Sequence, residues 1–258
     1  MRKYLVGGLA AVALAAPAVA LAQTPAPEVT ISGKVTPSRA GTAKKPKAAA
    51  FKFAATNSAA SQTTVSTIVL DLPKGVRLDG SGLPACRASE PQQIGSCRKA
   101  KLGVGVAYAS FVNKAAVAPD CVRTKGTASP SCITFDNTFY VGGKSVLTVY
   151  LAARAPFSAI QTVIKGRISA KGRRLTIRIP PSLQKSAGVF TALQGLSGQF
   201  KKVVTKRVRG KRRTFSFVST TSCPKGGWTS AATFFYVANP EPPLQAKQSE
   251  KATQRCRR

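Results

Sequence analysis

Acid–base chemistry in this chain would have to come from carboxylates, because the sequence contains no histidine. Histidine is the usual general base, the partner of Ser and Cys nucleophiles and the commonest zinc ligand. Five acidic residues lie between the expected tails: Asp71, Asp79, Glu90, Asp120 and Asp136. A glycosidase needs two facing carboxyl groups, roughly 5–10 Å apart. Asp71 and Asp79 are the most tempting pair, but in so basic a chain we favour ion-pair or turn roles for single carboxylates.

Other motifs that could carry catalysis lack their companion elements. Ser182-Leu183-Gln184-Lys185 matches S-x-x-K, but so does Ser96-Cys97-Arg98-Lys99, and neither has a KTG or SDN element elsewhere in the chain. Gly103-x-Gly105 lacks the third glycine of a dinucleotide site. We therefore predict a non-catalytic protein without a cofactor or a metal, and keep a carboxylate-dependent hydrolase as a minor hypothesis.

The charge of the chain points to anionic partners. It has 40 Lys and Arg residues against 8 Asp and Glu, a net charge of +32. Such a surplus attracts nucleic acid, acidic polysaccharide, wall polymer or anionic lipid by a salt-sensitive interaction that needs no sequence recognition. The alternative is that the charge is a general surface property without one dedicated partner.

The first residues have the pattern of an export signal. Met1-Arg2-Lys3 is cationic, Leu5 to about Ala16 is apolar, and Ala20-Leu21-Ala22 fits cleavage before Gln23. The apolar run is shorter than the roughly 20 residues of a membrane span. We expect a signal peptide at 1–22, a linker at 23–27, a β domain at 28–238 with a candidate internal break near 155, and a polar basic tail at 239–258. The mature protein would be extracellular or associated with the cell wall, without a membrane span.

Six cysteines follow the expected cleavage site, which suits an oxidising compartment. Ten residues separate Cys86 from Cys97, and ten separate Cys121 from Cys132. The simplest pairing closes these two loops and joins Cys223 to Cys256. Six cysteines allow fifteen full pairings, so the spacing alone leaves the others open. Zinc is disfavoured by the absence of histidine and of a C-x₂-C pair.

Alternating apolar and polar residues indicate an all-β chain. About eleven short strands separated by turn signals predict an immunoglobulin-like or jelly-roll-type antiparallel β-sandwich stapled by disulfides. The expected strands lie near 29–35, 51–53, 65–72, 104–112, 133–141, 146–151, 160–168, 174–179, 196–204, 214–218 and 229–237. One short helix is expected near Ser182–Leu193.

Two hairpins carry the basic residues that we single out as candidates for binding a polyanion. In the first, a two- or four-residue loop about Lys171-Gly172 places Ile168 opposite Leu175 and Lys165 opposite Arg178. Its outward face then carries Lys165, Arg167, Arg174 and Arg178. The second hairpin turns at Gly210, and we expect it to protrude as a cationic finger. It includes the basic residues Lys201, Lys202, Lys206, Arg207, Arg209, Lys211, Arg212 and Arg213.

Exposed aromatic residues would favour more specific partners. Stacking on single-stranded nucleic acid needs aromatics among the basic residues, but Phe200, Phe215 and Phe217 near the second hairpin are better explained as core residues. We expect nucleic acid to bind only adventitiously. Trp228 could stack on a sugar, but the preferred interpretation is that it packs near Cys223.

Four segments together carry a family resemblance: Leu72-Pro73-Lys74-Gly75-Val76, then Leu83-Pro84-x-Cys86, then Cys97 followed by Leu102-Gly103-Val104-Gly105, and finally Ser222-Cys223-Pro224 with Trp228. Over about residues 65–237 the chain resembles a group of uncharacterised secreted β proteins of soil actinobacteria. Arg98 stands where the group has proline, so the loop there is expected to differ in shape. The resemblance implies an exported, disulfide-bonded β protein and brings no functional residues with it.

The leading hypothesis is therefore a non-catalytic secreted sandwich that associates electrostatically with anionic cell-wall or extracellular polymer. The alternative is a glycan or small-molecule binder, which would need an aromatic-lined pocket and would bind in high salt. The oligomeric state is left open.

Overall fold

The computed structural model describes residues 28–59, 62–113, 115–127, 130–186, 188–238 and 246–258. The expected signal peptide, the linker at 23–27 and residues 239–245 lie outside these ranges. The elements are β1 (Val29–Thr36), β2 (Lys47–Asn57), β3 (Thr64–Asp71), β4 (Val76–Leu78), η2 (Pro91–Ala100), β5 (Lys101–Phe111), β6 (Cys132–Gly143), β7 (Val146–Ala153), β8 (Gln161–Ser169), η3 (Ala170–Gly172), β9 (Arg174–Arg178), α1 (Pro181–Gln184), β10 (Lys185–Ser186), β11 (Val189–Phe200), β12 (Val203–Val208), β13 (Lys211–Ser216), β14 (Val218–Thr220), β15 (Trp228–Val237) and β16 (Lys247–Gln254).

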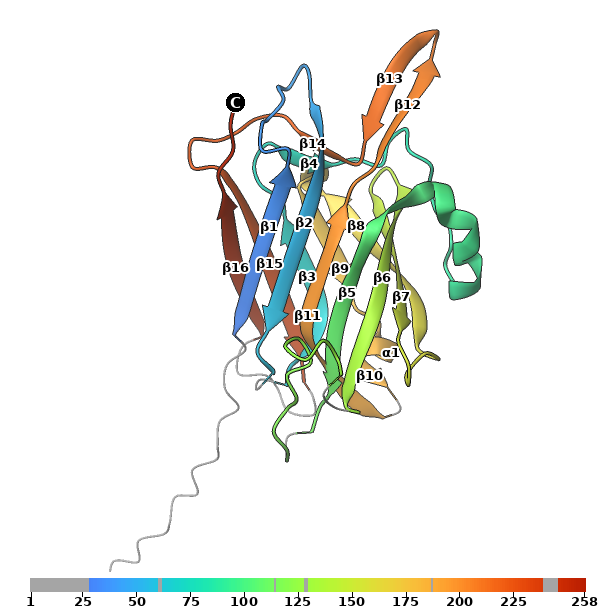
Figure 1. The fold of residues 1–258 in the computed structure, drawn as a ribbon, viewed down its shortest axis with the longest axis vertical. Coiled ribbons are helices and arrows are strands. Elements are labelled where there is room, and N and C mark those ends of the chain that lie inside the picture. Colours follow the sequence, from blue (N-terminus) through green and yellow to red (C-terminus); the bar gives the residue numbers. More distant parts are fainter. Residues whose placement is uncertain (1–27, 60–61, 114, 128–129, 187, 239–245) are drawn as a thin grey trace, which may run out of the picture.

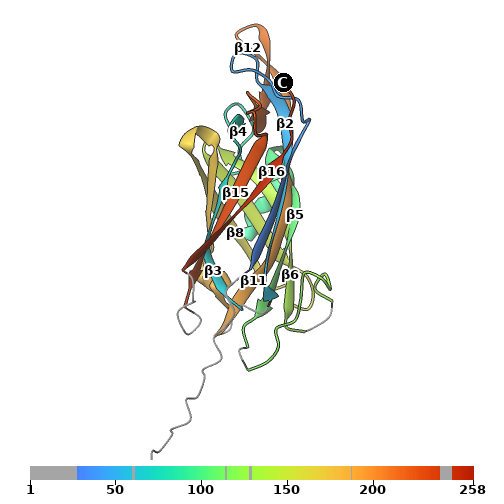
Figure 2. The same ribbon diagram turned by 90° about the vertical axis from the view of Figure 1, so that its left-hand side faces the viewer.

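The predicted all-β, disulfide-stapled sandwich is confirmed. Fourteen strands form one antiparallel sheet in the order β16-β15-β3-β9-β8-β7-β6-β5-β11-β2-β14-β4, with β1 beside β2 and β10 beside β11. The sheet curls back on itself, so that β2, β11, β5 and β6 face β15, β3, β9 and β8 across the interior (Figures 1 and 2). β7 and β8, on either side of Ala155-Pro156, pair directly, so the candidate break near 155 lies within one sheet.

The core forms because apolar residues alternate along the strands and meet between the two layers. Phe51 and Phe53 on β2 are buried, while Lys52 between them is exposed. Phe200 is fully buried, and its ring centroid lies 5.2 Å from that of Phe53 and 5.1 Å from that of Phe139. Such ring pairs stabilise a core beyond the area that they bury.

All three expected disulfides are present. Cys86 is bonded to Cys97, Cys121 to Cys132, and Cys223 to Cys256. The first two close loops beside the sheet, and the third joins the segment before β15 to the residues after β16. No cysteine of the described chain is free.

The predicted register of the first hairpin is correct. Ile168 pairs with Leu175, and a four-residue loop separates the paired residues Ser169 and Arg174. Lys171 has a φ of 56° and Gly172 a φ of 85° in that loop, values that glycine adopts freely and other residues adopt only rarely. Matching the two apolar faces was enough to fix this register.

Three expected boundaries are wrong, and the first is the helix near Ser182–Leu193. Only Pro181–Gln184 is helical, and Val189 begins β11, where residues pair with β5. Apolar residues are frequent enough around Leu183 and Leu193 to imitate a helical stripe, but pairing with a long neighbouring strand decides the conformation. In addition, the strand expected at 196–204 divides into β11 and β12, and the hairpin partner at 214–218 divides into β13 and β14.

The segment expected to be a polar tail contains the eight-residue strand β16. It pairs with β15 from Lys247 opposite Phe235 to Gln254 opposite Trp228. Threonine and serine hydroxyls pair across the two strands, with 2.9 Å between the Oγ1 atoms of Thr229 and Thr253. A strand whose outer side is polar carries little apolar alternation, so its sequence resembles a tail.

Among the described residues, no helix is long and apolar enough to cross a membrane.

Candidate anion-binding surface

β12 and β13 form a separate two-stranded sheet that projects beyond the end of the sandwich (Figure 1). We call this hairpin, Val203–Ser216, the finger. Its strands are joined by Arg209 and Gly210, whose φ angles are 51° and 75°. Two positive φ values are typical of the two-residue turn that matches the twist of a hairpin. The finger therefore has the protruding shape that the sequence predicted.

Like charges face each other across the finger. Arg207 pairs with Arg212, and Lys206 pairs with Arg213. Since residues alternate between faces, Arg207 and Arg212 share one face, while Lys206, Lys211 and Arg213 share the other; all five side chains are exposed. Directly opposed like charges are unfavourable, and an anion between them would relieve the repulsion. The finger is thus suited to anionic groups on both faces.

Phe215 fixes the root of the finger to the sandwich. Its ring packs against the apolar core, and Lys206 Nζ lies 5.0 Å from the ring centroid. Phe200 and Phe217 are fully buried. These three aromatics are core residues, as predicted, and the aromatic surface of the finger is covered by its own lysine.

Further basic residues meet at the end of the sandwich from which the finger projects. Antiparallel order brings the loops at 37–46, 72–75, 143–145, 170–173, 221–227 and 255–258 to this end, which we call the finger end; the segment at 79–100 lies there as well. Several backbone contacts join them, such as Ala40 N–H to Arg257 O at 2.8 Å and Thr221 N–H to Gly75 O at 2.7 Å. Their exposed basic residues are Arg39, Lys44, Lys45, Lys74, Lys144, Lys171, Arg173, Lys225, Arg255, Arg257 and Arg258.

The loops named above contain no Asp or Glu. The segment at 79–100, between β4 and β5, also lies at the finger end, as the bond from Gly80 N–H to Lys144 O shows, and it contains Asp79 and Glu90. At the opposite end, two of the basic side chains are paired: Arg123 Nε lies 3.6 Å from Asp120 Oδ2, and Arg154 donates to both carboxylate oxygens of Asp136 at 2.7 and 3.1 Å. This pairing lowers the pKa of Asp136, since the hydrogen bonds from Arg154 favour the ionised carboxylate. At the finger end the exposed basic side chains outnumber the carboxylates of Asp71, Asp79 and Glu90, so this end carries a net positive charge.

The outward face of the first hairpin is only partly free. Lys165, Arg167, Arg174 and Arg178 are exposed as predicted. Arg174 donates two hydrogen bonds to Asp71, at 2.7 and 3.1 Å. Lys165 Nζ donates to Ala88 O and, at 3.0 Å, to Thr148 Oγ1. These contacts tie Lys165 to the Cys86–Cys97 loop, and partial burial there lowers the pKa of its ammonium group.

The structure does not bring the two sets of candidate residues together. The first hairpin, β8 and β9, belongs to the main sheet, whereas the finger is a sheet of its own. Of the first set, only Arg167 and Arg178 make no side-chain hydrogen bond or ion pair with another described residue. The sequence identified the finger but could not reveal the finger end, because its loops are far apart along the chain and only strand direction unites them.

The four aspartates among the candidate carboxylates have structural partners. Asp71, Asp120 and Asp136 each pair with an arginine, and Asp79 Oδ1 accepts the Ser81 N–H at 2.8 Å in a turn. Glu90 precedes η2. The expected ion-pair and turn roles are confirmed at these four aspartates. No group of three or more potential metal-ligating side chains occurs in the described ranges.

Trp228 is a core residue. Its side chain is 1% exposed, and its Nε1–H donates to Ser222 O at 2.9 Å. Cys223 and Cys256 pack against the same core. The preferred interpretation is confirmed, and the alternative in which Trp228 stacks on a sugar is wrong, because no face of the ring reaches solvent.

No protein-family model, curated protein or solved structure matches the chain.

Proposed function

We propose that this protein is a non-catalytic extracellular protein that binds an anionic cell-wall or extracellular polymer through the finger and the finger end. The observation that carries the proposal is the concentration of exposed basic side chains on a protruding hairpin and on the adjoining loops, where they outnumber the carboxylates. A polymer with regularly spaced anionic groups would neutralise the opposed pairs Arg207–Arg212 and Lys206–Arg213 on the two faces of the finger.

An extracellular location is supported by chemistry as well as by the signal-like first residues. Three disulfides are typical of proteins that mature in an oxidising compartment. Outside the cell, the abundant polyanions are wall and matrix polymers rather than nucleic acid. Binding by many exposed Lys and Arg residues releases counterions, so the affinity for such a polymer should fall steeply with salt concentration.

The test is co-sedimentation of the oxidised mature protein with purified cell walls over a salt series, beside an unrelated basic protein of equal charge. The finger variant changes Arg207, Lys211, Arg212 and Arg213 to Gln. Its matched control also removes four exposed positive charges, by changing Lys34, Lys52, Arg167 and Arg178 to Gln on the sides of the sandwich.

We expect the finger variant to lose at least tenfold in affinity at low salt and the side variant to lose about twofold or less. Competing DNA should not abolish wall binding. Equal losses in the two variants, or wild-type binding no stronger than that of the unrelated basic protein, would show that the charge acts generically and would refute the proposal.

A further inference from the structure

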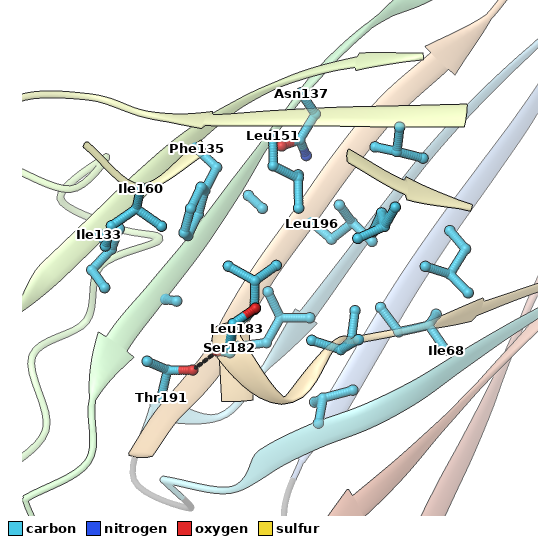
Figure 3. Close-up of a pocket in the computed structure, with 18 of the residues that line it drawn as sticks. Ile68, Ile133, Phe135, Asn137, Leu151, Ile160, Ser182, Leu183, Thr191 and Leu196 are labelled. Carbon is cyan, nitrogen blue, oxygen red and sulfur yellow. Dashed lines mark hydrogen bonds between the residues drawn. The ribbon is translucent and has the colours of Figure 1, made fainter. Parts of the chain in front are cut away.

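A cavity of about 100 Å³ lies between the two layers of the sandwich. Both layers line it: Phe53 on β2 and Leu196 on β11 belong to one layer, and Ile68 on β3 and Ile164 on β8 belong to the other. Leu196 and Ile68 are labelled in Figure 3. It extends to α1, where Ser182 lines it and is exposed to solvent. A second apolar void of about 30 Å³ shares Phe53, Ile68, Ile177 and Leu196 with the first, so the poorly filled space is elongated.

One polar side chain interrupts this apolar lining deep in the sandwich. On β6, alternate residues point inward, and the inward series runs Ile133, Phe135, Asn137, Phe139 and Val141. Asn137 is 1% exposed, and neither Oδ1 nor Nδ2 has a hydrogen-bond partner among the described residues. Figure 3 shows its amide group beside Leu151, directed toward the space that the drawn residues enclose.

A buried amide without partners costs folding free energy, so its presence calls for a compensating role. The fold satisfies buried amides elsewhere: Gln194, also 1% exposed, makes three hydrogen bonds of 2.9 Å, to Cys121 N–H, Ser110 Oγ and Pro119 O. A water molecule beside Asn137 would face mainly apolar side chains, whereas buried waters typically make about three hydrogen bonds. Neither a scaffold role nor a trapped water accounts well for Asn137.

We propose that the cavity binds a slim, uncharged, apolar molecule whose single hydroxyl or carbonyl group forms hydrogen bonds with the amide of Asn137. Asn137 offers one acceptor and two donor hydrogens, which suits either group. The described residues that line the cavity include no charged side chain, so an ionised ligand would be desolvated without compensation. Apolar protein cavities of roughly 150 Å³ accept molecules as small as benzene, and the elongated shape favours a short chain over a sugar ring.

This site is distinct from the proposed polymer-binding surface. The cavity reaches α1, and α1 lies at the end of the sandwich opposite the finger (Figure 1). Burial of an apolar ligand is strengthened or unchanged by salt, whereas polymer binding is weakened. Failure of one proposal therefore leaves the other standing, and the two can be tested on the same protein.

The first test uses 1-hexanol and the oxidised mature protein labelled with ¹⁵N. The side-chain amide signals of Asn137 are identified by their absence from the spectrum of Asn137→Leu. We expect these signals to shift saturably with 1-hexanol, both in 0.15 M salt and in roughly 1 M salt. Non-saturable shifts, or saturable binding that leaves the Asn137 amide signals in place, would overturn the proposal.

Variants then separate the polar anchor from the apolar space. Asn137→Leu should weaken 1-hexanol binding at least fivefold while leaving the binding of hexane unchanged within twofold. Ala109→Phe, which fills the cavity from β5, should abolish both, and Ala109→Leu serves if the larger residue prevents folding. The control is Thr176→Val. Thr176 lies on β9 between Leu175 and the lining residue Ile177, so its side chain faces outward. The Thr176→Val variant should bind both ligands as the wild type does. Equal binding of 1-hexanol by the wild type and Asn137→Leu, or binding that survives filling of the cavity by a folded variant, would refute the proposal.

Discussion

The side-chain amide of Gln254 on β16 makes both backbone hydrogen bonds at Val35 of β1 that a neighbouring strand would otherwise make. Its Nε2 donates to Val35 O at 2.9 Å, and its Oε1 accepts the Val35 N–H at 2.6 Å. β1 pairs with β2, and β16 pairs with β15. The amide of one glutamine thus bridges the first and last strands, where the curled sheet meets itself (Figure 1).

Gln254→Leu should lower the free energy of unfolding by about 2–4 kcal/mol, because it leaves the N–H and C=O groups of Val35 without these partners. The measurement is denaturant unfolding of the oxidised protein. Gln248→Leu is the matched control, since Gln248 lies on the same strand and its Oε1 has no partner in the described part of the chain. Equal losses in the two variants would mean that the bridge does not stabilise the closure.

Gln194→Leu should lower the free energy of unfolding by about 3 kcal/mol. The variant fits the same space but leaves the Cys121 N–H and Pro119 O without their side-chain partner, and these groups hold the Cys121–Cys132 loop against β11. Hydrogen exchange should accelerate first in residues 115–127. The control is Gln199→Leu, at an exposed position of the same strand, which should change the free energy of unfolding by less than about 0.5 kcal/mol. Unchanged hydrogen exchange of residues 115–127 in Gln194→Leu would contradict the anchoring role.

Tyr236 should make the protein unstable at alkaline pH. Burial raises the pKa of its hydroxyl well above its usual range, so the folded state binds the proton more tightly than the unfolded state, whose pKa is about 10. The stability from this group is complete below pH 10 and is lost as the pH rises further, by about 1.4 kcal/mol per pH unit.

Tyr236→Phe should remove that alkaline loss. Because the Tyr236 hydroxyl has no hydrogen-bond partner within the described ranges, the variant should also be about 1 kcal/mol more stable than the wild type at pH 7. Tyr150→Phe is the control, since the Tyr150 hydroxyl donates to Gln161 Oε1 at 2.7 Å and its removal should not stabilise the protein. Parallel stability curves for Tyr236→Phe and the wild type above pH 10 would contradict this account.

Local alternation was sufficient to predict the strands that have one buried face. β3, β8, β9 and β15 begin and end within about two residues of the expected positions, and the pairing of Ile168 with Leu175 followed from two apolar faces that had to coincide. β16 was missed because its side chains are polar, and pairing with β15 rather than apolar burial makes it a strand.

The candidate sites differ in how far the sequence could reveal them. The finger is visible as a run of basic residues about Gly210, because a hairpin is local. The finger end depends on strand direction, and the cavity depends on how two layers pack. Asn137 gave a weak signal as a polar residue in the apolar series of β6, but only the absence of a partner in the described structure distinguishes it from a satisfied core amide.

The absence of a side chain at Gly82 lets the Phe215 ring pack at the root of the finger. A Cβ atom at this position would lie 2.2 Å from Cδ1 and 2.4 Å from Cε1 of Phe215, and the φ of Gly82 is 73°. Gly82→Ala should therefore displace the Phe215 ring, disrupt its contact with Lys206, and cost about 1–3 kcal/mol of stability. Backbone amides of residues 203–216 should then exchange faster, while those of β5 keep their protection. Gly95→Ala is the matched control, because nothing lies within 4 Å of a Cβ at that position; if both variants leave the exchange of the finger unchanged, the ring contact is not what holds it.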